Sequence, residues 1–295
     1  MTSAVVAYRR ATLVGGTAIL MWGALALLTV WTGNVPPFQL IAMCFAIAFA
    51  GAMTKWLANG ENPLAHTRHP APVWILGVGG LFGYHFFYFL ALRNAPAVEA
   101  GLIAYLWPLL IVVFSALLPG ERLRWFHLAG ALLGLGGSAL LITGGGVVSF
   151  KSEFALGYGA AATCALTWAT YSVVSRRFGH VPTDTVGWFC GAAAVLGLIA
   201  HLVFEDTVWP TDAGQWLAVL ALGLGPVGLA FFVWDYGVKR GNIQSLGVFS
   251  YAAPLISTLL LIAFGAADLS WAVAIACAAI VGGALLASKE LIMRH

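Results

Sequence analysis

The side chains with chemical character inside the apolar stretches of this chain are aromatic rings and one histidine. Tyr84, His85 and Tyr88 fall in one such stretch, and their spacing would stack them on neighbouring faces of a helix. A neutral imidazole can donate one hydrogen bond and accept another, while a tyrosine offers a ring face and a hydroxyl. This set could bind a small flat molecule. A histidine that is satisfied by a helix carbonyl explains His85 equally well.

A Tyr-x-x-Pro segment occurs twice, as Tyr105 to Pro108 with Trp107 inside it, and as Tyr251 to Pro254. Proline has no N–H to donate, and its ring clashes with the carbonyl four residues earlier. The freed carbonyls could accept hydrogen bonds from a substrate ammonium, and both prolines could serve as hinges. Kinks that serve packing alone are an equally good explanation.

The 12 tryptophans divide by their depth in the apolar stretches. Trp22, Trp107 and Trp168 lie near the centres, where an aromatic ring needs a specific reason. The other nine, including Trp56 and Trp234, lie near the ends, which favours a belt at the membrane–water interface.

Acidic groups are notable for where they do not occur. The 11 Asp and Glu residues fall in loops or at the ends of apolar stretches, and we expect Asp235, four residues before Lys239, at the interface. A charge at the bilayer centre costs about 2.5–3.5 kcal/mol, which proton-coupled drug exporters tolerate for their carboxylate. The sequence therefore favours a neutral or zwitterionic substrate over a cationic drug. We expect no catalytic residue, no metal site and no cofactor, since no motif for one occurs outside a membrane context.

Composition places these residues in a membrane protein. Of 295 residues, 61% are hydrophobic and 8% charged, with a mean hydropathy of +0.92, whereas a soluble domain carries about 25% charged residues. Soluble, disordered and nucleic-acid-binding proteins are excluded. A membrane-spanning helix needs about 20 apolar residues. Ten stretches of that kind are found, at 11–31, 38–57, 73–92, 97–118, 125–143, 155–177, 186–204, 214–236, 244–265 and 270–289.

The cations orient these stretches. An even number of spans puts both termini on one side, and 12 of the 14 Lys and Arg residues fall on that side. The excess predicts cytoplasmic termini. Arg9 and Arg10 before an apolar run resemble a signal peptide. We expect no cleavage, because the run exceeds the usual 7–15 residues and no cleavage site follows.

The sequence also aligns with itself at a shift of 146 positions. Trp22 meets Trp168, and the two Tyr-x-x-Pro segments meet each other. Five spans is an odd number, so the second half would enter the membrane from the opposite side. We therefore predict an all-α polytopic membrane protein of ten transmembrane helices in a 5+5 inverted repeat, with repeats at 9–147 and 154–291. Such duplicated units can open alternately to either side around a site at their interface.

The ten spans, the repeat and the paired Tyr-x-x-Pro segments resemble the EamA-type branch of the drug/metabolite transporter superfamily. Within it, the chain is similar to the bacterial aromatic amino acid exporters. The resemblance implies a multi-pass carrier in the bacterial inner membrane. It would export Phe, Trp, Tyr or other apolar amino acids by alternating access, through a cavity lined by spans one, three, four, six, eight and nine.

The residues and the resemblance together give a candidate site. We expect the substrate to contact Trp22, His85, Tyr88, Tyr105, Trp107, Trp168 and Tyr251, with Pro108 and Pro254 as hinges. The expected partners are the substrate and the lipid bilayer, and the carrier is expected to be a monomer. The alternatives are a carrier of another small metabolite or drug, an intramembrane enzyme that uses His85, and a non-gated channel. The enzyme lacks a carboxylate or nucleophile at that depth.

Overall fold

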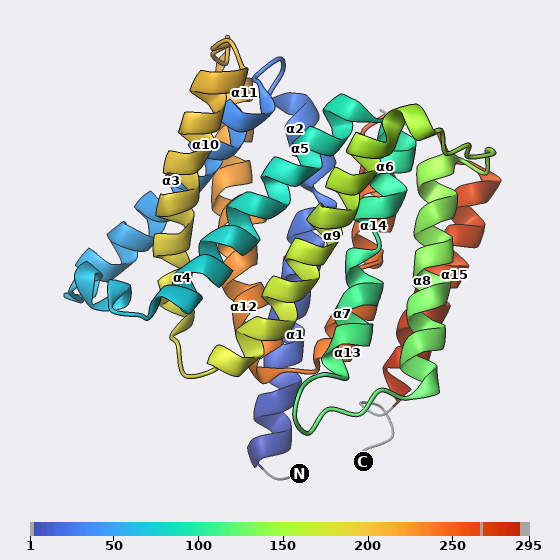
Figure 1. Ribbon diagram of the computed structural model, residues 1–295, viewed down its shortest axis with the longest axis horizontal. Coiled ribbons are helices and arrows are strands. Elements are labelled where there is room, and N and C mark those ends of the chain that lie inside the picture. The colour runs from blue at the N-terminus through green and yellow to red at the C-terminus, as the bar shows by residue number, and fades with distance from the viewer. Residues whose placement is uncertain (1–2, 266–267, 290–295) are drawn as a thin grey trace.

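The computed structural model describes residues 3–265 and 268–289, and every regular element in those ranges is helical (Figure 1). The α-helices of the first half are α1 (Ser3–Gly23), α2 (Leu25–Trp31), α3 (Pro37–Ala58), α4 (Ala71–Val78), α5 (Tyr84–Asn94), α6 (Ala97–Ala104), α7 (Trp107–Ser115) and α8 (Trp125–Thr143). Those of the second half are α9 (Ala155–Ser175), α10 (Val186–Phe204), α11 (Ala213–Leu224), α12 (Ala230–Arg240), α13 (Ile243–Phe249), α14 (Ala252–Ala263) and α15 (Trp271–Ala287).

Short helices of other kinds join or interrupt these elements. Two are single π-helical turns, η2 (Gly79–Gly83) between α4 and α5, and η6 (Gly225–Leu229) between α11 and α12. The others are 3₁₀ turns, η1 (Pro63–Thr67), η3 (Ser152–Phe154), η4 (Arg176–Phe178) and η5 (Thr183–Thr185). Such π-helical turns are frequent at functional sites.

Residue chemistry explains where the helices begin and end. Pro37 opens α3, where a missing N–H costs nothing because the first turn of a helix has no partner for it. Gly144 ends α8 in the left-handed conformation, at φ 60°, which a residue without a Cβ adopts at no steric cost.

Each of the ten predicted stretches contains a helix, and eight of the ten meet the length and hydropathy of a membrane span. Eight helical segments in the described ranges are long and apolar enough to cross a membrane. The two predicted spans outside this set correspond to α9 and α15. Helix α15 has only 17 residues. Helix α9 has 21, yet its threonine, serine and tyrosine side chains lower its hydropathy.

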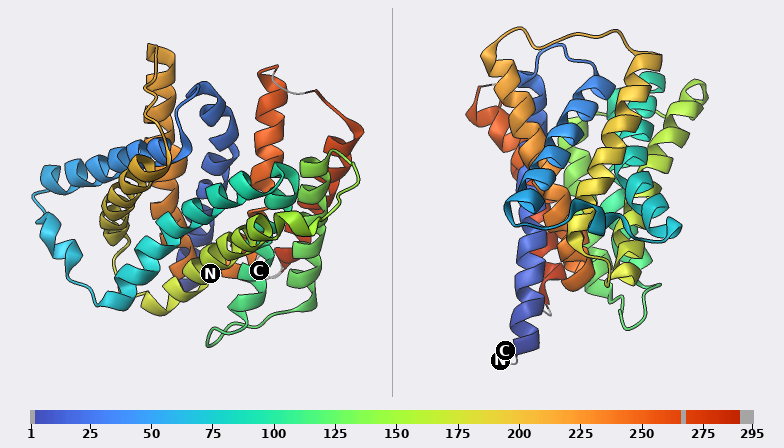
Figure 2. Two further views of the ribbon diagram at one scale, coloured as in Figure 1. Left: turned by 45° about the horizontal axis from the view of Figure 1, so that its top comes forward. Right: turned by 90° about the vertical axis from the view of Figure 1, so that its left-hand side faces the viewer.

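Four helix pairs hold the bundle together. Helix α8 packs along α15 at one side of the molecule, and α3 packs along α10 at the other (Figure 1). Between them, α1 packs on α12 and α5 packs on α9. The start of α1 and the end of α15 lie at the same end of the bundle, and Figure 2 shows this in two further views.

Glycines allow the closest of these contacts. A Cβ on Gly130 of α8 would lie 2.6 Å from the carbonyl oxygen of Gly283 in α15, and Gly187 of α10 lies against Trp56 and Ala52 of α3. The Gly-xxx-Gly segments that contain Gly130 and Gly187 therefore serve packing inside the chain, as small residues commonly do in membrane helices.

We predict that Gly283→Leu destabilises the protein, because its Cβ would lie 2.5 Å from the carbonyl oxygen of Gly130. Overpacking of this kind costs about 1–3 kcal/mol. The matched control is Gly282→Leu, since no atom lies within 4 Å of a Cβ there. Thermal unfolding in detergent should show a lower Tm for Gly283→Leu alone. Equal midpoints for both variants would contradict this contact.

Candidate functional site

A cavity of about 190 Å³ lies at the centre of the bundle, enclosed by residues from both halves of the chain. Six of the seven predicted contact residues line it, and Tyr251 does not. The full lining is Trp22, Leu25, Tyr84, His85, Tyr88, Phe89, Ala104, Tyr105, Trp107, Trp168, Pro226, Phe231 and Ala253. No charged side chain is among them. The volume falls below the roughly 300–1,000 Å³ typical of small-molecule pockets, so the rings must separate to admit an amino acid.

Four tryptophans form a cluster at this cavity, and three of them, Trp22, Trp107 and Trp168, line it. The ring centroid of Trp22 lies 6.1 Å from that of Trp107, 5.7 Å from that of Trp168 and 5.0 Å from that of Trp234. The indole N–H of Trp22 donates to the carbonyl oxygen of Pro226, at 3.1 Å. Helices α1, α7, α9 and α12 therefore meet through one cluster of rings. Trp22 meets Trp107 and Trp168 edge to face, a geometry that aromatic pairs prefer.

Trp234 was predicted in the interfacial belt, and that prediction is wrong. Its side chain is fully buried, and its indole N–H donates to the hydroxyl of Ser172 at 3.0 Å. Trp56 is also fully buried, stacked on His66 with 4.7 Å between ring centroids. Position along a helix gave the depth of these residues but not whether they face lipid or protein.

His85 satisfies both interpretations that the sequence left open. Its Nδ1 lies 2.7 Å from the carbonyl oxygen of Leu81, which can only accept, so Nδ1 carries the proton. In the neutral ring, Nε2 is then an acceptor, and no hydrogen bond to it is found among the described residues. Phe45 and Phe231 pack against the ring at right angles. The histidine is thus held by its own helix and still presents an acceptor to the cavity that it lines.

The two Tyr-x-x-Pro segments interrupt their helices at equivalent places, but their tyrosines differ. Tyr105 lies between α6 and α7 and lines the cavity. Tyr251 lies between α13 and α14, is fully buried outside the cavity, and its hydroxyl accepts from the backbone N–H of Leu109 at 3.1 Å. The helix break at Pro108 removes the usual partners of such an N–H. Tyr251 therefore ties one interrupted helix to the other.

The freed carbonyls also differ. Ala104, four residues before Pro108, lines the cavity. Ser250, four residues before Pro254, is fully buried, and its carbonyl oxygen already accepts from the N–H of Ala253 at 3.1 Å. Ala253 of the second segment also lines the cavity, so the two segments differ in their freed carbonyls rather than in whether they border the cavity.

Tyr84 and Phe231 line the cavity, although neither is among the expected substrate contacts. Tyr84 stacks on Tyr88 with the rings 3° from parallel, as the spacing of four residues would allow. The periodicity of α5 could have identified Tyr84. Nothing in the sequence distinguishes Phe231 from its neighbour Phe232.

Charged residues lie instead near the ends of the bundle, and several of them lie at the end where α1 begins. Asp235 was predicted at the interface, but its side chain is only 2% exposed and lies 2.9 Å from Nζ of Lys239. Thr183 donates to the same carboxylate at 2.8 Å. Nearby, a guanidinium nitrogen of Arg176 lies 2.7 Å from Glu121. Buried charges need partners of this kind.

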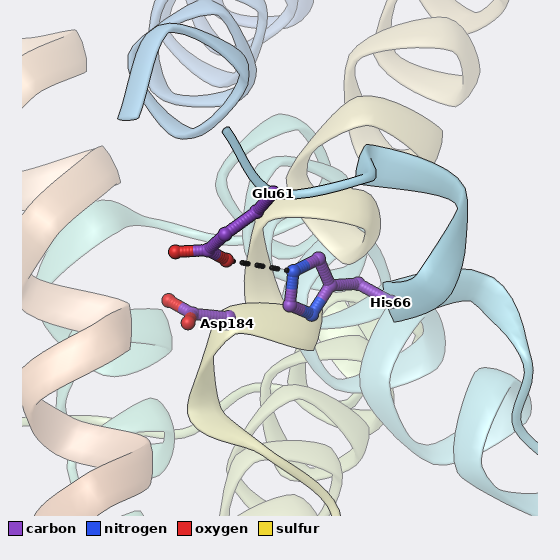
Figure 3. Close-up of side chains that lie close together, drawn as sticks. All are labelled: Glu61, His66 and Asp184. Atoms are coloured by element: carbon purple, nitrogen blue, oxygen red, sulfur yellow. Dashed lines mark hydrogen bonds and ion pairs between the residues drawn. The ribbon is translucent and has the colours of Figure 1, made fainter. Parts of the chain in front are cut away.

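The same end carries one group of side chains that could hold a metal ion. Figure 3 shows Glu61, His66 and Asp184, whose ligand atoms lie within 4.8 Å of one another. Nε2 of His66 lies 3.2 Å from Glu61, and Nζ of Lys55 lies 2.6 Å from Asp184. The Lys55 ammonium would therefore compete with a metal ion for the Asp184 carboxylate.

The chain matches the EamA-like transporter family over two stretches, residues 10–143 and 155–289. The helices and the uncharged central cavity define a multi-pass membrane transporter, and the chain belongs to the EamA-like transporter family.

Two curated relatives and one solved structure are similar along nearly the whole chain. The aromatic amino acid exporter YddG of Ancylobacter novellus is 58% identical, over 94% of this chain and 96% of that one. The protein of the same name from Salmonella typhimurium is 26% identical, over 85% of this chain and 87% of that one. A crystal structure at 57% identity gives a TM-score of 0.90 and covers 97% of this chain and 99% of that one.

Acidification should weaken the fold through His69, whose Nε2 lies 3.0 Å from the hydroxyl of Thr185. Partial burial lowers the pKa of His69, and Lys239, His180 and His66 lower it further. When the pH falls below the ordinary histidine pKa of about 6.5, this residue takes up a proton more readily in the unfolded chain than in the folded protein. The free energy of unfolding therefore decreases as the pH decreases. We predict that His69→Gln loses less Tm than the wild type between pH 7.5 and 5.5.

The control for this prediction is Arg68→Gln, which changes a neighbouring side chain that does not titrate in this range. It should keep the wild-type pH dependence of Tm. An unchanged dependence in His69→Gln would show that its protonation is not coupled to folding.

Proposed function

We propose that this protein exports aromatic and other apolar amino acids, with Phe, Trp and Tyr as the principal substrates. The observation that carries the proposal is the uncharged cavity, whose walls are mostly aromatic rings. Rings select flat apolar side chains, because each ring pair adds about 0.5–1.5 kcal/mol beyond the burial of area. The relatives named as aromatic amino acid exporters support the same substrate class.

The architecture that we propose is ten transmembrane helices in two inverted repeats, residues 9–147 and 154–291. Three features support it. The family matches the chain twice. The π-helical turns η2 and η6 begin at Gly79 and Gly225, 146 positions apart. Helices at equivalent positions also pair, α3 with α10 and α8 with α15.

The orientation that we propose places both termini in the cytoplasm and the chain in the bacterial inner membrane. The excess of Lys and Arg on the side of the termini supports it. The charged groups around Asp235 and Arg176 then lie at the cytoplasmic end of the bundle, beyond the rings.

In the proposed mechanism, the substrate ring lies among Trp22, Trp168 and Tyr88, and its ammonium is held by acceptors. Two acceptors are available in the lining, Nε2 of His85 and the carbonyl oxygen of Ala104. Several weak contacts give an affinity that still permits release.

Movement of the two repeats about their interface would expose this cavity to each side in turn. Pro108 and Pro254 are the proposed hinges, because both lie at helix interruptions, where the backbone is free to bend. The lining has no carboxylate for proton exchange, so we propose facilitative transport by a monomer. Catalysis at His85 is not proposed, since its neighbours are rings rather than nucleophiles.

Counterflow in liposomes tests the function. Purified protein should exchange labelled phenylalanine with internal Phe, Trp or Tyr in a saturable way. It should show little exchange with cationic drugs at any pH. Preferred exchange of another metabolite would identify a different carrier of this family, and flux that does not saturate would indicate a channel.

We predict that Tyr88→Leu and Tyr105→Leu each weaken the apparent affinity for phenylalanine about two- to tenfold. Each change keeps an apolar side chain but removes one ring contact, worth about 0.5–1.5 kcal/mol. The matched control is Tyr158→Leu, because Tyr158 packs on Phe150 and Phe154 away from the cavity. Wild-type affinity in both cavity variants would exclude the proposed site.

His85→Phe tests the ammonium acceptor. A hydrogen bond to a charged group contributes about 1.5–3 kcal/mol, so the wild type should bind phenylalanine at least tenfold more tightly than phenylpropionate, which has no amine. We predict that the preference is lost in His85→Phe and partly kept in His85→Gln, which retains an acceptor. A preference that survives in His85→Phe would assign the ammonium to other groups. Competition in the counterflow assay measures both affinities.

A further inference from the structure

A second, larger cavity opens on the side of the molecule. It has a volume of about 740 Å³ and lies between α3 on one side and α1 and α12 on the other, with η6 at its floor. In Figure 1, α3 lies in the left-hand part of the bundle, and α1 and α12 lie nearer its centre. We refer to this cavity as the lateral groove. It runs from membrane depth at η6 to the end of the bundle where α1 begins.

The walls of the lateral groove are apolar and open. Leu224 and Leu229 border it with about half of their surface exposed, 51% and 53%. Gly51 of α3 also lines it, and no atom lies within 4 Å of a Cβ built there. These residues belong to segments long and apolar enough to cross a membrane. Water is absent at such depth, so apolar surface of this kind faces acyl chains.

Cations surround the open end of the lateral groove. Arg10 lines it, is exposed, and makes no ion pair or hydrogen bond with any described residue. Lys55 lines it too, although it pairs with Asp184 at 2.6 Å. A third cation, Arg240, lies 4.8 Å over the ring of Tyr236, another lining residue. Asp184 lines the groove as well, so the charged lining residues are two cations and one carboxylate, and the net positive charge comes from Arg10.

The lateral groove and the central cavity share a wall. Gly223 and Gly228 face the groove, while Pro226 between them lines the central cavity and accepts the hydrogen bond from Trp22. The π-helical turn η6 therefore borders both spaces. An occupant of the groove would thus rest on the segment that positions Trp22.

We propose that the lateral groove binds one anionic phospholipid from the leaflet at this end of the bundle. One acyl chain lies along Gly51 and Leu229, and the phosphate lies at Arg10 and Lys55. Basic pockets between membrane helices bind anionic head groups in this way, at about 1 kcal/mol for each cation near the surface. The site does not depend on which substrate the central cavity takes.

The experiment measures lipid binding by native mass spectrometry of the intact protein released from detergent. The protein is titrated with phosphatidylglycerol and, separately, with phosphatidylcholine of the same acyl chains. We expect one phosphatidylglycerol to bind with preference over phosphatidylcholine. Because transport is not measured, failure here would leave the proposed substrate untouched, and failure of transport would leave this site untouched.

Two variants locate the binding. Arg10→Gln should weaken phosphatidylglycerol binding about fivefold, the equivalent of about 1 kcal/mol, while phosphatidylcholine binding stays the same. Gly51→Leu should displace either lipid by filling the groove. The matched controls are Lys289→Gln, an exposed cation at the end of α15, and Gly136→Leu, an open position on α8. Both controls should bind as the wild type does.

Three outcomes would overturn the proposal. The first is equal binding of the two lipids, and the second is wild-type binding in Arg10→Gln. The third is competition of free phenylalanine with the lipid, which would make the groove a substrate path. Arg10 is exposed, so its variant is expected to fold even if Gly51→Leu is not.

Discussion

The structure depends on one constraint, that the polar groups of the central rings find partners inside the protein. The indole N–H of Trp22 reaches the carbonyl oxygen of Pro226, and that of Trp234 reaches the hydroxyl of Ser172. The imidazole of His85 uses the carbonyl oxygen of Leu81. Because water does not replace a lost partner in the bilayer, these bonds fix the orientation of the rings. The cavity exists where fixed rings leave space between them.

Charged side chains are also distributed unevenly along the axis of the bundle. The cavity has no ionised side chain, while the end where α1 begins has buried pairs such as Asp235 with Lys239. A carboxylate is tolerated there because an ammonium and the hydroxyl of Thr183 satisfy it. The substrate path and the charged closure of the bundle are therefore chemically distinct regions of one fold.

Much of this arrangement could be predicted from the sequence. Hydropathy located every helix, because the apolar length needed to span a membrane is a strong signal. Depth along the helices identified Trp22, His85 and Trp168, which line the cavity. A membrane helix has no polar outer face to show which side points away from the protein. The sequence therefore could not give the direction of each ring around its helix, and Trp234 was assigned to the interfacial belt although it is buried. The difference between Tyr105 and Tyr251 was also hidden, since it arises from contacts between elements distant in the chain.

The bond between Tyr251 and Leu109 has a consequence for how the two proposed repeats can diverge. Two copies that start alike are both constrained by packing. Because Tyr251 already connects the two interrupted helices through Leu109, its counterpart Tyr105 does not need to make an equivalent contact. Tyr105 can then vary toward new ligands without loosening the crossing of the interrupted helices, although both halves of the chain line the cavity.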